Sequence, residues 1–274
     1  MYNVVQLFAK YGAHIMFVVL EIICFYLIIN YNLVQKEIFL NSSNVYAAKI
    51  AQQQSKISQF SNLRNQNDSL MHENATLIEN LITIEYSSDN IPEADSFYNQ
   101  YSLIPASICN STIHLRNNHF TLCKGSREGI KKDMGVISSH QGIIGIVRNV
   151  SENFSHVMSL LNSQTKISCS IKSRKGHGSL VWKTMDPLRM TLESIPKHEK
   201  IAVGDTVITS GYSTMFPRGI LVGKIEKYVS IPGSNNYDIT VKLFNDLTNI
   251  KYAYVIQNRL DTEQTKLEKE VVDE

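Results

Sequence analysis

The segment Val203-Gly-Asp-Thr-Val-Ile-Thr-Ser-Gly-Tyr-Ser-Thr-Met-Phe-Pro-Arg-Gly-Ile-Leu-Val-Gly223 decides the fold class of this 274-residue chain. Its residues Val207–Thr209 predict a short strand, and Ser210–Gly211 is the turn that ends it. Pro217 and Gly219 bracket a second turn before the next strand starts. Short strands separated by glycine and proline turns are typical of a β-barrel or a sandwich.

The same segment could also be read as the edge of a hydrolase site, because Ser210 and Ser213 flank Gly211 with Asp205 upstream. A serine nucleophile needs an adjacent base, an orienting carboxylate and an oxyanion hole. The G-x-S-x-G elbow is not matched, since Thr209 stands at its first glycine position and Gly211 at its serine position. We therefore interpret both serines as turn residues and predict no catalytic residue.

The rest of the region after Tyr101 repeats this pattern of short apolar runs and turn residues. No long amphipathic helix is visible there, which argues against a parallel α/β enzyme fold. The predicted strands are Ser102–Cys109, His119–Cys123, Gly135–Ser138, Ile143–Val150, His156–Leu161, Lys166–Ile171, Gly178–Trp182, Met190–Leu192, Thr206–Thr209, Leu221–Val229, Tyr237–Leu243 and Ala253–Gln257. The fold class is mainly β with an α-helical N-terminal part.

The N-terminal part contains an apolar run, AHIMFVVLEIICFYLIINYNLV, over residues 13–34. Its length matches the hydrocarbon core of a bilayer, and it is too long for the apolar core of a signal peptide. It predicts one transmembrane helix after a short N-terminus, residues 1–12. Lys10 and Lys36 flank opposite ends, so charge does not orient it. Glu21 is either a contact with another membrane helix or a tolerated neutral side chain.

Residues 36–86 lack glycine and proline and predict a helical stalk. Its leucines recur every seven residues, as the d positions of a parallel two-stranded coiled coil do. The predicted dimer seam is Phe60, Leu63, Asn67, Leu70, Asn74, Leu77, Leu81 and Ile84, with the asparagines at a positions. Ile50 and Ile57 belong to a different phase. The alternative is an amphipathic helix that packs on its own globular domain. The segment Ser87–Pro92 breaks the helix, because Pro92 cannot continue it, and residues 88–100 are a polar linker.

Four residues between the first two predicted strands invite a metal-site hypothesis: Cys109, His114, His119 and Cys123. The histidines lie between the cysteines, unlike the usual zinc spacing, and strand alternation would divide the side chains between two faces. A cross-strand disulfide is a further alternative, but unmodified hairpin residues are our interpretation. We predict no metal and no cofactor. The net charge of +2 gives no indication of nucleic-acid binding.

Several motifs in the β region, taken in order, resemble the rod shape-determining MreC family. They are Lys124-Gly-Ser-Arg-Glu-Gly-Ile-Lys-Lys-Asp-Met-Gly-Val-Ile137, Gln141-Gly-Ile-Ile-Gly-Ile-Val147, Ser159-Leu-Leu-Asn-Ser163, Gly178-Ser-Leu-Val-Trp182 and the Val203–Gly223 segment. The order of membrane helix, coiled coil and β region is similar too. The resemblance implies two six-stranded β-barrels like those of chymotrypsin-like proteases, without a catalytic triad. We expect them at 101–160 and 161–258, an arrangement in which closing strands can be exchanged between the barrels. The charged tail at 259–274 is expected to be either flexible or a frayed helix.

The resemblance also implies a function as a non-catalytic scaffold in the bacterial inner membrane. Its N-terminus would be cytoplasmic and its β region periplasmic or extracytoplasmic. It would be a homodimer that organises lateral peptidoglycan synthesis and so maintains cell shape. The implied partners are a class B penicillin-binding transpeptidase, MreD, RodA and an MreB-linked complex. Phe216 is a candidate partner contact or a core residue. The alternatives are a membrane-anchored serine hydrolase and an envelope adaptor for another assembly.

Overall fold

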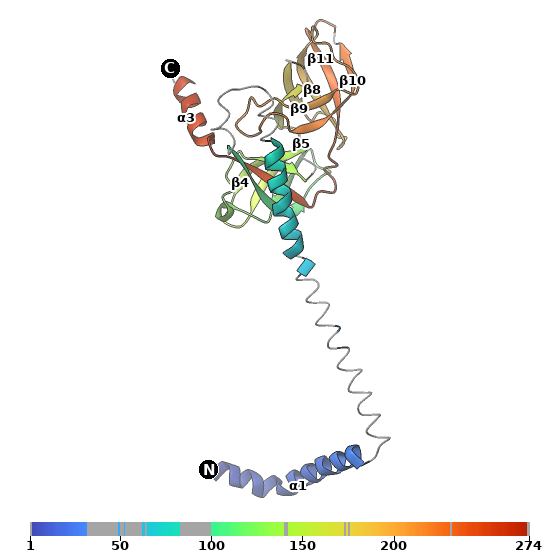
Figure 1. Cartoon of the computed structure of the whole chain (residues 1–274), viewed down its shortest axis with the longest axis vertical. Coiled ribbons are helices and arrows are strands. Elements are labelled where there is room, and N and C mark those ends of the chain that lie inside the picture. The colour runs from blue at the N-terminus through green and yellow to red at the C-terminus, as the bar shows by residue number, and fades with distance from the viewer. Residues whose placement is uncertain are drawn as a thin grey trace. The chain divides into compact units, whose positions relative to one another are not determined.

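A computed structural model describes residues 2–31, 49, 52, 62–63, 65–82, 100–139, 142–172, 174, 176–230 and 232–272. The chain divides into two compact units, Met1–Asp68 and Ser69–Glu274. Figure 1 shows the elements of both units.

The first unit contains helix α1, Tyr2–Tyr31. An 18-residue window within it, Tyr11–Ile28, is long and apolar enough to cross a membrane, by length and composition. The helix starts well before the predicted span, so most of the short N-terminus expected at 1–12 is also helical. Residues 32–34, where the span was expected to end, lie outside the described residues.

The second unit contains two closed six-stranded barrels, which confirms the predicted fold class. The first has the strand order β1-β12-β3-β4-β5-β2, and the second has β10-β11-β8-β7-β6-β9. The strands are β1 Tyr101–Ser111, β2 Asn117–Leu122, β3 Gly135–Ser138, β4 Ile143–Val150, β5 Ser155–Asn162, β6 Lys166–Ile171, β7 His177–Val181, β8 Arg189–Pro196, β9 Thr206–Thr209, β10 Leu221–Ser230, β11 Asn236–Leu243 and β12 Tyr252–Asn258, with a short 3₁₀ turn η2 at Ser126–Glu128.

The last strand corrects the expected limits of the second barrel. β12 pairs with β1 and β3, so it closes the first barrel and is not part of a second barrel at 161–258. A closing strand exchanged between the barrels is one of the arrangements that the family resemblance implied. The physical reason is that β1 and β3 would otherwise each have an unpaired edge.

The charged tail is helical, which is one of the two forms expected for it. Residues Asp261–Val272 form helix α3, with Asp261 and Glu263 in its first turn. Carboxylates at that position interact favourably with the helix dipole. The segment contains no glycine or proline that would break a helix.

The connection between β9 and β10 of the second barrel, which lies within the Val203–Gly223 segment, packs against β3 of the first barrel. Phe216 in this connection is only 2% exposed. A Cβ placed on Gly135 of β3 would lie 2.5 Å from the Phe216 ring and would also overlap the carbonyl oxygen of Met215. Phe216 is therefore a core residue at the junction of the barrels. This result corrects the hypothesis that it contacts a partner.

The close approach at Gly135 predicts that Gly135→Ala destabilises the protein by about 2 kcal/mol, because the added methyl group overpacks the junction. Chemical denaturation of both variants would measure this. The control is Gly176→Ala, whose added Cβ meets the flexible side chain of Glu199. Equal losses for the two variants would show that the barrel junction is not tightly packed.

Candidate functional site

The connection between β9 and β10 is fixed by Thr209. Its hydroxyl donates a hydrogen bond to the Pro217 carbonyl oxygen at 2.5 Å and accepts one from the Ile220 amide at 2.9 Å. Gly211 and Gly219 have φ of 79° and 93°, a conformation that favours glycine. The glycines and Thr209 thus form the two turns that the sequence predicted, and these turns position Phe216 between the barrels.

The two serines of this segment lie in those turns. The Ser210 hydroxyl donates to Ser168 Oγ at 2.8 Å and accepts a hydrogen bond from the Tyr212 amide. Ser213 Oγ accepts a hydrogen bond from the Met215 amide. These contacts to Ser168 and to backbone amides stabilise the turns.

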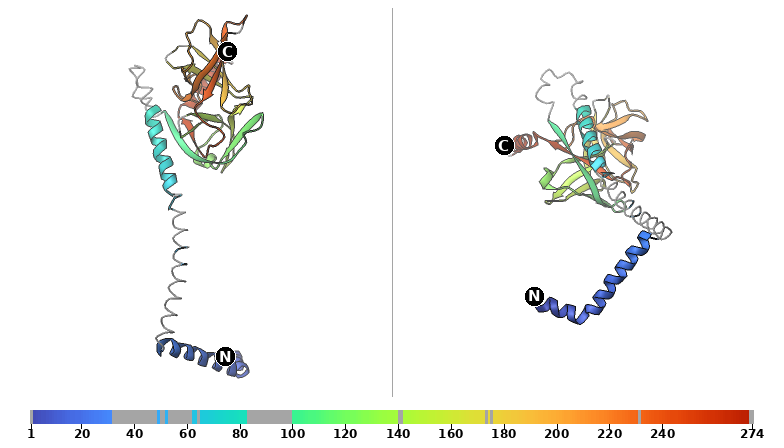
Figure 2. Two further views of the ribbon diagram at one scale, coloured as in Figure 1. Left: turned by 90° about the vertical axis from the view of Figure 1, so that its right-hand side faces the viewer. Right: turned by 60° about the horizontal axis from the view of Figure 1, so that its bottom comes forward.

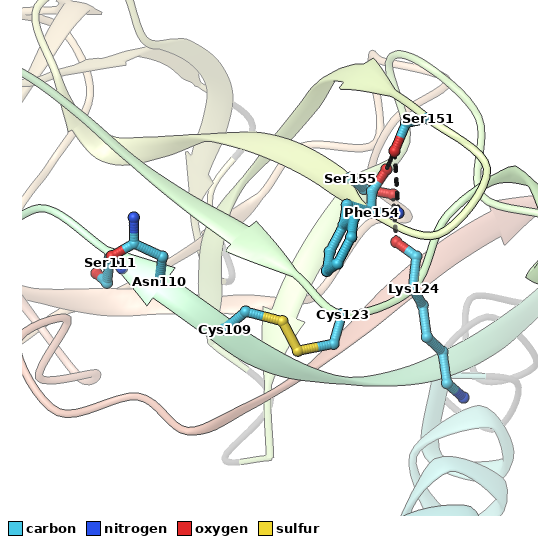
Figure 3. Close-up of a disulfide and its surroundings, with 8 residues drawn as sticks. All are labelled: Cys109, Asn110, Ser111, Cys123, Lys124, Ser151, Phe154 and Ser155. Atoms are coloured by element: carbon cyan, nitrogen blue, oxygen red, sulfur yellow. Dashed lines mark hydrogen bonds between the residues drawn. A yellow bond between two sulfur atoms is a disulfide. The ribbon is translucent and has the colours of Figure 1, made fainter.

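The cysteines of the β1–β2 hairpin form a disulfide, Cys109–Cys123, with a Cα–Cα distance of 5.6 Å (Figure 3). This corrects the interpretation of unmodified hairpin residues. The pairing shifts register between Ile108 and Asn110, so Cys109 occupies a β-bulge. Both cysteines are exposed. Alternation along a regular strand did not predict that a bulge would turn Cys109 toward its partner.

The histidines of this region are divided between two places. His114 is exposed in the hairpin loop, whereas the His119 ring stacks on His156 of β5, with ring centroids 4.7 Å apart. Burial and the neighbouring His119 lower the pKa of His156. Among the described residues, no group of three or more His, Cys, Asp or Glu side chains is arranged to hold a metal ion.

The described stalk helix, residues 65–82, packs on the barrels by one face. Met71, Ala75 and Ile78 are buried, and Ile82 is half-buried. Their spacing of four, three and four residues places them on one side of an α-helix. A small cavity of about 30 Å³ brings Ile78 and Ile82 close to Ile137 of β3 and to Arg218–Ile220 of the second barrel. The stalk helix therefore contacts both barrels.

Hydrogen bonds also join the stalk helix to the first barrel. Residues 101–107 of β1 pair with β12 along one edge, while β2 pairs only with 108–111. On the remaining edge the Leu103 amide donates to Glu79 Oε1 at 2.6 Å. Asn74 hydrogen-bonds the Tyr254 hydroxyl of β12. Burial raises the pKa of Tyr254, and the bond to Asn74 partly opposes that shift. The helix thus supplies a hydrogen-bond partner to an otherwise open strand edge.

The leucines of the predicted dimer seam lie on a different face. Leu63, Leu70, Leu77 and Leu81 are at least half exposed, at 61%, 58%, 54% and 50%. At 100° per residue, this row lies roughly a quarter turn from the face that is buried on the barrels. Among the other seam residues, Asn67 is half-buried and Asn74 is exposed, while Phe60 and Ile84 lie outside the described residues. The stalk helix therefore carries two distinct apolar faces.

The face of the stalk that packs on the barrels was not predicted, although the sequence contains its signal. Met71, Ala75, Ile78 and Ile82 follow the helical period next to the heptad leucines. The heptad pattern accounted for the helix by itself, and so the second apolar stripe was not identified. The alternative of a helix that packs on its own domain is correct for this part of the stalk. Glu21, the other predicted contact residue, is exposed on α1.

A known protein family matches the region of the two barrels. The profile of the family described as "Rod shape-determining protein MreC, barrel core" matches residues 108–257. This range covers more than half of the chain and extends from the end of β1 through β12.

Relatives with assigned names match the same region. The chain is 28% identical over 162 residues to the cell shape-determining protein MreC of Geobacillus stearothermophilus, and equally to that of Bacillus subtilis strain 168. Each alignment covers 54% of this chain and 54% of the relative, so the chain matches about half the length of these relatives.

Solved structures show the same fold. MreC of Listeria monocytogenes superposes with a TM-score of 0.55 at 24% identity, covering 71% of this chain and 91% of that chain. MreC of Pseudomonas aeruginosa gives a TM-score of 0.52 at 18% identity, covering 56% of this chain and 98% of that chain.

The contact between the stalk and β1 predicts that Glu79→Ala exposes the strand edge. We expect the Leu103 amide to exchange its hydrogen faster. We also expect the two-barrel head, residues 101–258, to lose about 2 kcal/mol of stability, because a buried donor loses its partner. Residue-resolved hydrogen exchange and denaturation measure the two effects. Glu73→Ala, at an exposed position of the same helix, is the control. If Glu73→Ala changed Leu103 exchange as much, the effect would come from helix stability alone.

Proposed function

Since the chain belongs to the MreC family of rod shape-determining proteins, we propose that it is a non-catalytic, membrane-anchored scaffold. It organises and regulates the lateral peptidoglycan synthesis machinery and so maintains cell shape. The observation that carries this proposal is the family match across both barrels, residues 108–257. The apolar helix α1 supplies the anchor.

The packing of the stalk supports a scaffold role. The helix contacts both barrels through its buried face, so the head and the end of the stalk move together. A scaffold needs this property, because a partner bound at the barrels is then held in a fixed position relative to the end of the stalk. The turns of Thr209–Gly219 contribute packing and orientation to the same junction.

We propose that the exposed leucine row of the stalk is a homodimer seam. Leu63, Leu70 and Leu77 are seven residues apart and remain exposed while the adjacent face of the helix packs on the barrels. Leucine at d positions opposite a second copy would bury these side chains, and asparagine at a positions would fix the register. The leucine row therefore stays available to a second copy, while Asn74, an a position of the seam, is already hydrogen-bonded to Tyr254 of the first barrel.

The disulfide supports an extracytoplasmic head. Cys109 and Cys123 are exposed at the protein surface, where cytosolic thiols are kept reduced. A stable Cys109–Cys123 bond therefore requires export of the β region. With one membrane helix before it, the N-terminus would remain in the cytoplasm.

The proposed partners follow from the family. Outside the membrane the head binds a class B penicillin-binding transpeptidase and biases it toward an active conformation. Within the membrane MreD and RodA are the proposed neighbours, with Glu21 as a contact to one of their helices. The short N-terminal segment connects to the MreB-linked complex in the cytoplasm.

Thiol counting tests the proposed orientation. In the protein denatured straight from cells under non-reducing conditions, a maleimide–polyethylene glycol reagent should label two cysteines, Cys24 and Cys169. After reduction it should label four. Cys109→Ser should expose Cys123 to labelling and lower stability by about 3 kcal/mol, as expected for a short disulfide loop. Four labelled thiols without reduction would place the head in a reducing compartment.

Binding to the transpeptidase tests the proposed function. The full-length chain in detergent should be a dimer by light scattering and should bind the extracytoplasmic part of the host's class B transpeptidase. Leu70→Glu combined with Leu77→Glu should give a monomer, because two charges at d positions prevent seam burial.

A matched control separates the seam from general surface effects. Leu115→Glu changes an equally exposed leucine of the head and should leave the dimer intact. A wild-type chain that binds no transpeptidase would contradict the proposed scaffold role. A dimer that survives both seam substitutions would contradict the seam and leave the scaffold role standing.

A further inference from the structure

Two neighbouring strands of the first barrel, β2 and β5, place two imidazoles and a thioether side by side. Figure 2 shows the green strands of this barrel from two further sides. His119 of β2 lies opposite Met158 of β5, and directly opposite side chains share a face, with Cβ atoms about 5 Å apart. His156 is two positions from Met158 on the same strand, so it points the same way. We call these three residues the His–Met cluster.

The His–Met cluster lies on the outer face of the barrel. The residues next to its members, Phe120 and Val157, are buried in the apolar core, so alternation turns the cluster outward. Both histidines are half-buried. Met158 is only 6% exposed, although it lies outside the continuous apolar core that the described residues form. Its thioether is therefore covered beside the histidines and not in the barrel interior.

Thr112 determines which ring nitrogen of His119 carries the proton. Its hydroxyl donates to the His119 carbonyl oxygen at 3.2 Å and accepts a hydrogen bond from the His119 amide at 3.0 Å. Since its single proton is used, it can only accept from His119 Nδ1, 3.5 Å away. Nδ1 then carries the ring proton and Nε2 the lone pair. Metal-binding histidines are oriented in this way, by a hydrogen bond from the ring nitrogen that does not bind the metal.

His156 supplies a second nitrogen that is free to bind a ligand. Among the described residues, its Nδ1 is the one buried side-chain nitrogen or oxygen atom that makes no hydrogen bond. An unpaired buried polar atom costs free energy, and a bound ion is one explanation for it. Burial and the neighbouring His119 lower the pKa of His156. The imidazole is therefore neutral at neutral pH and keeps the lone pair that metal binding requires.

The spacing of the two rings suits a shared ion. Their centroids are 4.7 Å apart and their planes are inclined by 36°. A metal–nitrogen bond of about 2 Å places a ring centroid roughly 3 Å from the ion, so both rings can reach one ion. The torsion that turns a histidine ring is soft, which lets both nitrogens point toward that ion. Methionine has three rotatable bonds, and its sulfur can approach the same position from Met158.

We propose that the His–Met cluster binds one Cu(I) ion through His119 Nε2, His156 Nδ1 and the Met158 sulfur. Thioether ligands favour Cu(I), and imidazole also binds copper well. Neither β2 nor β5 contains Asp, Glu or Cys, whereas zinc sites are built from Cys, His and carboxylates. Binding to neutral ligands releases no proton and changes no oxidation state. The ion joins β2 to β5 and so stabilises the first barrel.

Competition with the chelator bicinchoninate measures the Cu(I) affinity of the full-length chain in detergent under nitrogen. The background is Cys24→Ser, because Cys24 is an exposed thiol. Met158→Leu conserves side-chain volume and removes the sulfur. It should weaken Cu(I) binding by at least roughly tenfold, since even loss of an outer-shell partner has an effect of this size. The matched control is Met185→Leu, at a methionine of the second barrel that is 65% exposed, and it should change the affinity less than about twofold.

A second variant, His119→Gln, should weaken Cu(I) binding to a similar degree, because it removes a nitrogen ligand. Cu(I) should raise the unfolding temperature of the background and of Met185→Leu but not of Met158→Leu, since a ligand stabilises only the state that binds it. X-ray absorption should detect a sulfur ligand on the bound copper.

Equal Cu(I) affinity of Met158→Leu and the background, absence of Cu(I) binding, a copper site without sulfur, or tighter binding of Zn(II) would each overturn the proposal. Similar unfolding temperatures of all variants without metal show that the fold is intact. Every measurement uses the chain without the transpeptidase, so the outcome is independent of the proposed function.

Discussion

The first barrel closes only when its final strand returns from beyond the second barrel. β12, Tyr252–Asn258, forms hydrogen bonds with β1 on one side and β3 on the other. Without it, both strands would have open edges, and an open edge favours pairing with other chains. The whole second barrel is thus inserted between two strands of the first. The two barrels must fold as a coupled pair, because the first cannot be completed before the chain has passed through the second.

The same strand explains why the stalk is part of the head. Residues Ala253–Ile256 are all buried, although successive side chains of a strand point to opposite faces. One face therefore lies in the barrel interior and the other is covered from outside. Asn74 of the stalk bonds the Tyr254 hydroxyl, and Glu79 bonds the neighbouring edge of β1. Closure of the barrel and docking of the stalk thus depend on one strand, and a force applied to the stalk is transmitted directly to it.

Much of this architecture could be predicted from the sequence, because strand alternation and turn residues are local signals. All twelve strands were located, and glycines with positive φ mark the turns around Phe216. The pairing of strands that lie far apart in the sequence was harder to predict. The place of β12 depends on edges formed about 150 residues earlier, as with Tyr101 and its partner Asn258. The disulfide was only an alternative, because the sequence does not show whether Cys109 and Cys123 face each other across the hairpin. The burial of Phe216 was left open because proline and glycine turns are usually exposed.

The two faces of the stalk helix and the net charge of the β region both bear on how two copies of the chain could pair. The stalk helix uses one face for the barrels and leaves the leucine row beside it exposed, so docking on the head and pairing with a second copy are compatible. A dimer would place two heads side by side, each with a net charge of +9 in its β region, since residues 101–258 contain 19 Lys and Arg against 10 Asp and Glu. Like charges repel, and close packing of two such heads would cost free energy at low salt. In the proposed dimer, the exposed leucine row of the stalk would supply the attraction that two positively charged heads lack. The distribution of charge and the two-faced stalk therefore favour pairing through the helix over pairing through the barrels.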